Sequence, residues 1–146
     1  MPLDLFGKTK LPDKIPSGME DVIDELKILG AKEECLKRVY DILSEKYEGR
    51  RYLTYLKISS VFRKDANGFW KKQGFMHCTN INYLARILLV KSGKFSEDDI
   101  KLRWTLIWGV SPHQYLQVNI GDKWIKIDIW ARPYDIKYGD NAHGFH

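Results

Sequence analysis

The apolar residues of this chain change their spacing once, near Gly93. Before it, over residues 19–29, 32–47 and 79–92, they recur every three or four positions, which is the spacing of amphipathic helices. After it, over residues 102–108 and 114–130, they alternate with other residues, which is the spacing of strands. Helices followed by strands predict an α+β fold, in which a core helix packs on an antiparallel sheet.

The length of the chain fits one domain. Its 146 residues, 44% of them apolar, are enough to form a core without metals or disulfides. Residues 1–18 contain three prolines and two glycines and no sustained apolar period, which predicts an arm that lies over the domain or stays mobile. We expect the domain to span residues 19–138 and a C-terminal tail to occupy residues 139–146.

Several classes of protein and partner are disfavoured by the sequence. It has no run of about 18 apolar residues that predicts a membrane span, and its N-terminus does not resemble a secretory signal, so we expect a cytoplasmic protein without a membrane partner. The net charge of +5 is spread along the chain, so we do not expect a nucleic-acid partner. The Cys and His residues lack the repeated spacing of zinc sites, and we expect no metal and no other cofactor.

The end of the strand region predicts a β-hairpin. With Gly121-Asp122 as a two-residue turn, Tyr115 lies opposite Asp128, and His113 and Asp128 become diagonal neighbours on one face. Diagonal pairs lie about 7 Å apart at the backbone, within reach of an imidazole and a carboxylate. The other face carries Leu116, Val118, Ile120, Ile125, Ile127 and Ile129, and is expected to be buried against a helix.

The two cysteines differ in their surroundings. Cys35 belongs to the apolar stripe of helix 32–47, which predicts a core residue. Cys78 comes directly before the apolar helix 79–92, so it is expected at or just before a helix N-terminus. A helix N-terminus and a nearby imidazolium both favour the thiolate, which is the nucleophilic form of cysteine. Alone, a cysteine in this position is more often a small buried residue.

Three parts of the sequence together resemble the transglutaminase-like superfamily of papain-like thiol enzymes. They are Gly74-Phe75-Met76-His77-Cys78 before an apolar helix, His113 in a strand, and Asp128 at the end of the segment that follows Gly121. The match covers about residues 70–130. The resemblance implies a papain-like core with Cys78 as nucleophile, His113 as general base and Asp128 as the residue that orients the base. It also implies that Cys78 approaches His113, which periodicity does not show.

The resemblance further implies chemistry on amides through an acyl-thioenzyme. Peptidases, amidases and transglutaminases of the family share this intermediate, and the substrate is expected to be a peptide or protein. The candidates for a second oxyanion donor are Gln73 and Trp70, and the candidates for the substrate groove are His77, Tyr115 and Trp130. The alternative function is a non-catalytic module that keeps the groove and binds a peptide or nucleic acid.

Overall fold

The computed structural model describes residues 10–16, 18–48, 70–71, 74–107 and 111–142. Its longer elements are α1 (Glu20–Lys27), α2 (Lys32–Lys46), α5 (Cys78–Lys91), β3 (Ile100–Ile107), β4 (Ser111–Asn119) and β5 (Trp124–Ile127). The shorter elements are strands β1 (Tyr47–Glu48) and β2 (Gly74–Phe75), and the 3-10 turns η2 (Glu97–Asp99) and η3 (Arg132–Tyr134). The α+β class predicted from the sequence is confirmed.

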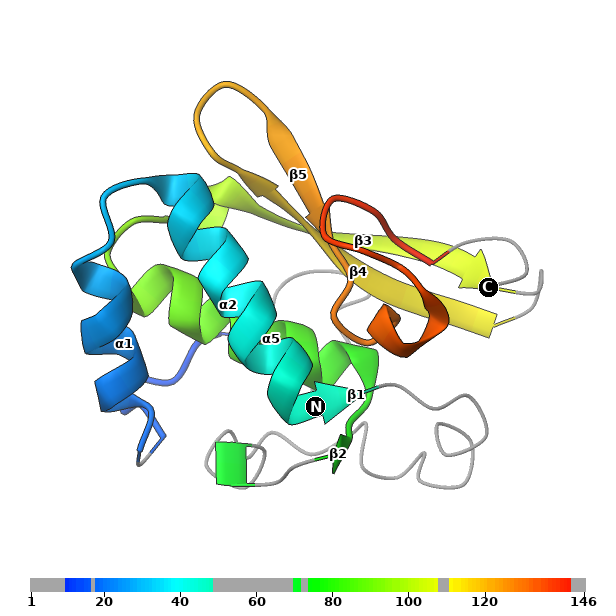
Figure 1. The fold of residues 1–146 in the computed structure, drawn as a ribbon, viewed down its shortest axis with the longest axis horizontal. Coiled ribbons are helices and arrows are strands. Elements are labelled where there is room, and N and C mark those ends of the chain that lie inside the picture. Colours follow the sequence, from blue (N-terminus) through cyan, green and yellow to red (C-terminus); the bar gives the residue numbers. More distant parts are fainter. Residues whose placement is uncertain (1–9, 17, 49–69, 72–73, 108–110, 143–146) are drawn as a thin grey trace.

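Helix α5 lies at the centre of the molecule. It contacts α1 and α2 on one side and β4 on the other (Figure 1). Every side chain from Thr79 to Leu89 is buried, including those of Asn80, Asn82 and Arg86. The sequence predicted a one-sided apolar stripe for this helix. The difference arises because α5 is covered by helices on one side and by the sheet on the other, so that its polar positions are enclosed as well.

The three-stranded sheet has the antiparallel order β3-β4-β5. Leu116 faces Ile127 and Asn119 faces Trp124, so the turn lies at Gly121-Asp122 as predicted. Gly121 has a φ of 113°, a conformation that side chains with a Cβ rarely adopt. The apolar residues of the inner face are buried, with Ile120 only partly so: Leu116, Val118, Ile125, Ile127 and Ile129.

Segments before and after the core also pack against it. Leu11 and Ile15 of the N-terminal arm contact the core, and the Tyr83 hydroxyl donates to the carbonyl of Lys10 at 3.3 Å. In the segment expected to be a tail, Asn141 and Ala142 are 5% and 1% exposed. The run 52–62, which mixes helix and strand spacing, lies outside the described residues.

None of the described helices combines the length and the apolar character that a membrane crossing needs.

Candidate functional site

His113 and Asp128 form a buried polar contact next to α5. The Nε2 atom of His113 lies 2.6 Å from Oδ2 of Asp128, so the diagonal contact predicted from the hairpin is present. His113 is 2% exposed, and its ring lies 4.9 Å from the Trp130 ring, centroid to centroid. The alternation of exposed and buried residues in β5 ends at Ile127, and the next four residues, Asp128 to Ala131, are all buried. This turn of the chain brings Trp130 over the imidazole.

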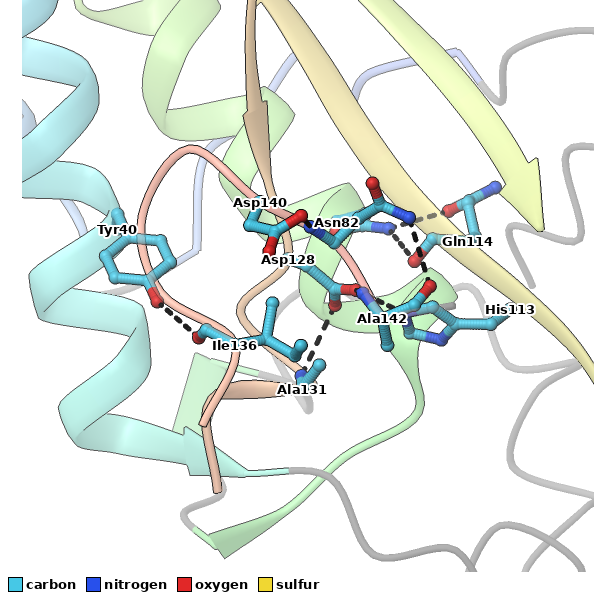
Figure 2. A network of polar contacts seen from close by, with 10 residues as sticks. Tyr40, Asn82, His113, Gln114, Asp128, Ala131, Ile136, Asp140 and Ala142 are labelled. Carbon is cyan, nitrogen blue, oxygen red and sulfur yellow. Dashed lines mark hydrogen bonds and ion pairs between the residues drawn. The ribbon is translucent and has the colours of Figure 1, made fainter. Parts of the chain in front are cut away.

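The Asp128 carboxylate is held by backbone groups from two segments. Its Oδ1 accepts the N–H of Ala131 at 3.3 Å, and its Oδ2 accepts the N–H of Ala142 at 2.8 Å (Figure 2). Asp128 is 1% exposed, and a carboxylate so far from water requires such donors. With His113, three groups therefore fix the orientation of the carboxylate.

The protonation of His113 is set by opposing effects. Burial alone lowers the pKa of this imidazole, whereas the charge and hydrogen bond of Asp128 raise it, and a hydrogen bond with the side chain and the charge of Cys78 raise it further. The net effect is a pKa well above the usual value of histidine. The imidazolium form of His113 is therefore favoured at neutral pH.

Cys78 is the first residue of α5, with His77 as the extended N-cap residue before it. Its side chain is half-buried and its thiol is free. The parallel pairs of β1 with β2, Tyr47 with Gly74 and Glu48 with Phe75, tie the segment before Cys78 to the end of α2. Gly74 has a φ of 87°, so the turn into this segment favours glycine.

A buried amide pair fixes α5 to β4 beside the site. The Asn82 side-chain amide donates to the carbonyl oxygen and to Oε1 of Gln114, both at 3.1 Å. Asn82 lies one helical turn after Cys78, and Gln114 follows His113 directly. This cross-link explains why the start of α5 meets the start of β4, which periodicity left undecided.

The structure thus brings Asp128 to His113, at the end of β4 that meets the start of α5. Nε2 of His113 is engaged with Asp128, which stabilises a positive charge on the imidazole. The effect of Cys78 on the pKa of His113 indicates that these two side chains are near one another.

The other predicted site residues have different surroundings. Trp130 contacts His113, Tyr115 is half-buried two positions after His113, and His77 is 2% exposed directly before Cys78. Trp70 packs against the ammonium group of Lys46, whose nitrogen lies 4.4 Å from the centroid of the Trp70 ring. This contact gives no support for a role of Trp70 as oxyanion donor. Gln73 lies outside the described residues.

Sequence reasoning missed the residues that support the site. Asn82 is a polar residue among apolar neighbours in α5, and this position was the only sign in the sequence that its side chain has a buried polar partner. Ala131 and Ala142 act through backbone N–H groups, which no residue type reveals. Among the residues that the structure describes, no group of three or more His, Cys, Asp or Glu side chains is arranged to hold a metal ion.

Shortening the chain tests the contribution of Ala142. A chain that ends at Asp140 loses the N–H bound to Asp128, and a hydrogen bond to a buried charged group contributes about 1.5–3 kcal/mol. We therefore expect its free energy of unfolding, measured by urea denaturation, to fall by about 2 kcal/mol. The matched control ends at Gly144 and keeps Ala142. Equal stability of the two chains would show that the Ala142 contact contributes nothing.

Comparisons with models of protein families, with curated proteins and with solved structures found no match to this chain.

Proposed function

We propose that this protein is a thiol-dependent enzyme that cleaves an amide or transfers its acyl group, on a papain-like core of the transglutaminase type. The observation that carries the proposal is the buried contact of His113 with Asp128, 2.6 Å from Nε2, at the end of β4 that meets the start of α5, where Cys78 lies. Cys78 also raises the pKa of the imidazole. Aspartate, histidine and cysteine in this order are the groups that cysteine acyl transfer requires.

In the proposed reaction, the proton of the Cys78 thiol has already passed to His113, and the sulfur of the resulting thiolate attacks the carbonyl carbon of the amide. The carbon–nitrogen bond then breaks, His113 gives the proton to the leaving nitrogen, and a thioester on Cys78 and a free amine result. Water or a second amine next attacks the thioester, with His113 accepting its proton and returning it to the sulfur. Water as acceptor completes hydrolysis, and an amine completes transfer.

The start of α5 supports the same chemistry. The backbone N–H of Cys78 lies in the first helical turn, where N–H groups have no carbonyl partner within their own helix. Such a group is a suitable donor for the oxyanion that forms during attack, and the helix dipole adds to its effect. Trp130, packed on His113, limits the access of water to the imidazole.

Trapping the acyl group on Cys78 tests the proposal. The protein is incubated with a peptide library rich in Gln, Asn and C-terminal amides, quenched in acid, and examined by peptide mass spectrometry. We expect a mass gain on the Cys78 peptide that hydroxylamine removes. The gain should be absent in Cys78→Ala and retained in Cys35→Ala, because Cys35 is fully buried. Peptide binding without an adduct on Cys78 would instead identify a non-catalytic binding module.

A further inference from the structure

The side of the sheet that faces away from α5 carries several basic side chains. Successive residues of a strand point to opposite faces, and β3 pairs with β4 without interruption from Ile100 with Val118 to Ile107 with Ser111. The residues opposite to buried Leu116 and Val118 therefore share one face. We name this the outer sheet face, and its members used below are Lys101, Arg103, Tyr115, Gln117, Trp124 and Lys126.

Two contacts between side chains confirm that these residues share a face. The Lys101 ammonium lies 4.3 Å from the centroid of the Trp124 ring, which it reaches across β4. The Nε of Arg103 donates to Oε1 of Gln117 at 2.9 Å. Trp124 is 37% exposed. The outer sheet face is thus a surface and not a second core.

The outer sheet face leads to the candidate site. His113 belongs to the same face of β4 as Tyr115, and the strand pairs place Thr105 beside His113 and Arg103 beside Tyr115. From His113 to the end of β4 at Asn119, six residues span about 20 Å. An extended chain lying along this face would pass over basic side chains towards the end of the sheet at which α5 begins.

The positive charge of this face is uncompensated. Among the described residues, no carboxylate lies within ion-pair distance of Lys101, Arg103 or Lys126, and no residue of β3, β4 or β5 on this face is acidic. Acidic residues lie beyond its far end: Asp99 contacts Lys32 and Asn119, and Asp122 lies in the turn between β4 and β5.

The helices on the other side of the molecule have the opposite balance. Helices α1 and α2 carry eight Asp or Glu side chains against five Lys or Arg, and Arg38 pairs with Glu25 at 2.7 Å. The charges are therefore separated, with acidic helices on one side and a basic outer sheet face on the other.

We propose that the outer sheet face binds an acidic, extended segment of a protein substrate and thereby presents a neighbouring amide to Cys78. This inference rests on the proposed function. Basic side chains without internal partners attract a negatively charged chain, and they set partner preference and association rate. A peptide suits the face better than a nucleic acid, because the ring of Trp124 is already engaged by Lys101 and so is less free to stack on a base.

Binding is tested with labelled probes in a Cys78→Ala background, where no covalent product forms. The probes are an eight-residue peptide of six glutamates around a central Gln-Gly pair, the same peptide with lysine or serine for glutamate, and an eight-nucleotide oligothymidylate. Fluorescence anisotropy gives each Kd at low and at physiological salt. The variant is Lys101→Glu/Arg103→Glu/Lys126→Glu, and the matched control is Lys37→Glu, an exposed lysine on α2.

The glutamate peptide is expected to bind more tightly than the lysine and serine peptides and the oligothymidylate, and more weakly as salt rises. The triple variant should weaken its binding at least about tenfold, and Lys37→Glu should change the Kd less than about twofold. All three substituted residues are exposed. Should the triple variant not fold by circular dichroism, Lys101→Glu and Lys126→Glu singly should each weaken binding at least about threefold.

Three results would overturn the inference: no binding of the glutamate peptide, an equal loss in Lys37→Glu, or tighter binding of the oligothymidylate. Its failure is distinguishable from failure of the proposed function, which depends on the acyl adduct at Cys78. An adduct without preference for acidic peptides refutes only the substrate class. Binding of acidic peptides without an adduct leaves the outer sheet face as a docking surface and refutes its role in presenting a substrate.

Discussion

Replacing His113 with alanine is expected to slow alkylation of Cys78 by iodoacetamide at pH 6 at least about tenfold. An ordinary free cysteine is only about 0.3% thiolate at this pH. In the proposed site, His113 carries a positive charge near Cys78, and a nearby positive charge favours the thiolate form of a cysteine. Removing the imidazole leaves only the start of α5 to stabilise the anion, so reactivity at low pH should be lost while reactivity at pH 10 is retained.

The measurement follows alkylation rates from pH 5 to pH 10 in a Cys35→Ser background, so that Cys78 is the reporting thiol. Gln117→Ala is the matched control, because it changes another half-buried polar residue of β4 two positions beyond Tyr115. Its pH profile should coincide with that of the parent. If the parent protein itself shows the profile of free cysteine, the proposed role of Cys78 is wrong, whatever the fold of the variants.

Replacing Asp128 with asparagine is expected to lower the free energy of unfolding by about 3 kcal/mol at pH 6, because removal of one partner of a buried ion pair leaves the other uncompensated. Asparagine also presents one acceptor oxygen in place of the two that receive the N–H groups of Ala131 and Ala142. The loss should therefore exceed that of a single neutral hydrogen bond.

The pH dependence of this loss has a definite sign. Asp128 and Cys78 raise the pKa of His113 in the folded protein above its value in the unfolded chain. The stabilisation is therefore fully present below the unfolded pKa of about 6.5 and is lost as the pH rises through the raised, folded-state value. We expect the difference in stability between wild type and Asp128→Asn to shrink progressively above about pH 7.

Urea denaturation at a series of pH values gives these free energies, in a Cys78→Ala background so that the thiol does not contribute. Tyr115→Phe is the control, because it changes a residue next to His113 without altering the buried charges. A constant difference in stability between wild type and Asp128→Asn from pH 6 to pH 10 would mean that Asp128 does not raise the pKa of His113 in the folded protein.

Patterns along the chain predicted the parts of the site that are local. The alternation of apolar residues from Gln114 to Trp130 and the turn at Gly121-Asp122 were sufficient to predict the pairing register of β4 with β5. This register brings His113 close to Asp128. The apolar spacing of residues 79–92 placed Cys78 at a helix N-terminus. Each of these results depends on hydrogen bonds between residues near in sequence, so a short window of residues contains the information.

The rest of the site depends on residues that are distant in sequence. The amide of Asn82 meets Gln114 of β4, and the N–H of Ala142 meets Asp128. The first contact joins a helix to a strand, and the second uses a backbone group that every residue except proline possesses. Neither has a periodic signature, which is why residues 139–142 were expected to form a tail.

Periodicity and turn residues were therefore enough to predict an α+β chain with its helices first, the hairpin register, and a cysteine at the start of a core helix. Three features appear only in the folded chain: the start of α5 meets the start of β4, residues 139–142 pack over Asp128, and the basic residues gather on the outer sheet face. Periodicity reports which face of an element is buried, whereas the mutual placement of elements follows from side-chain packing and polar contacts over long sequence separations.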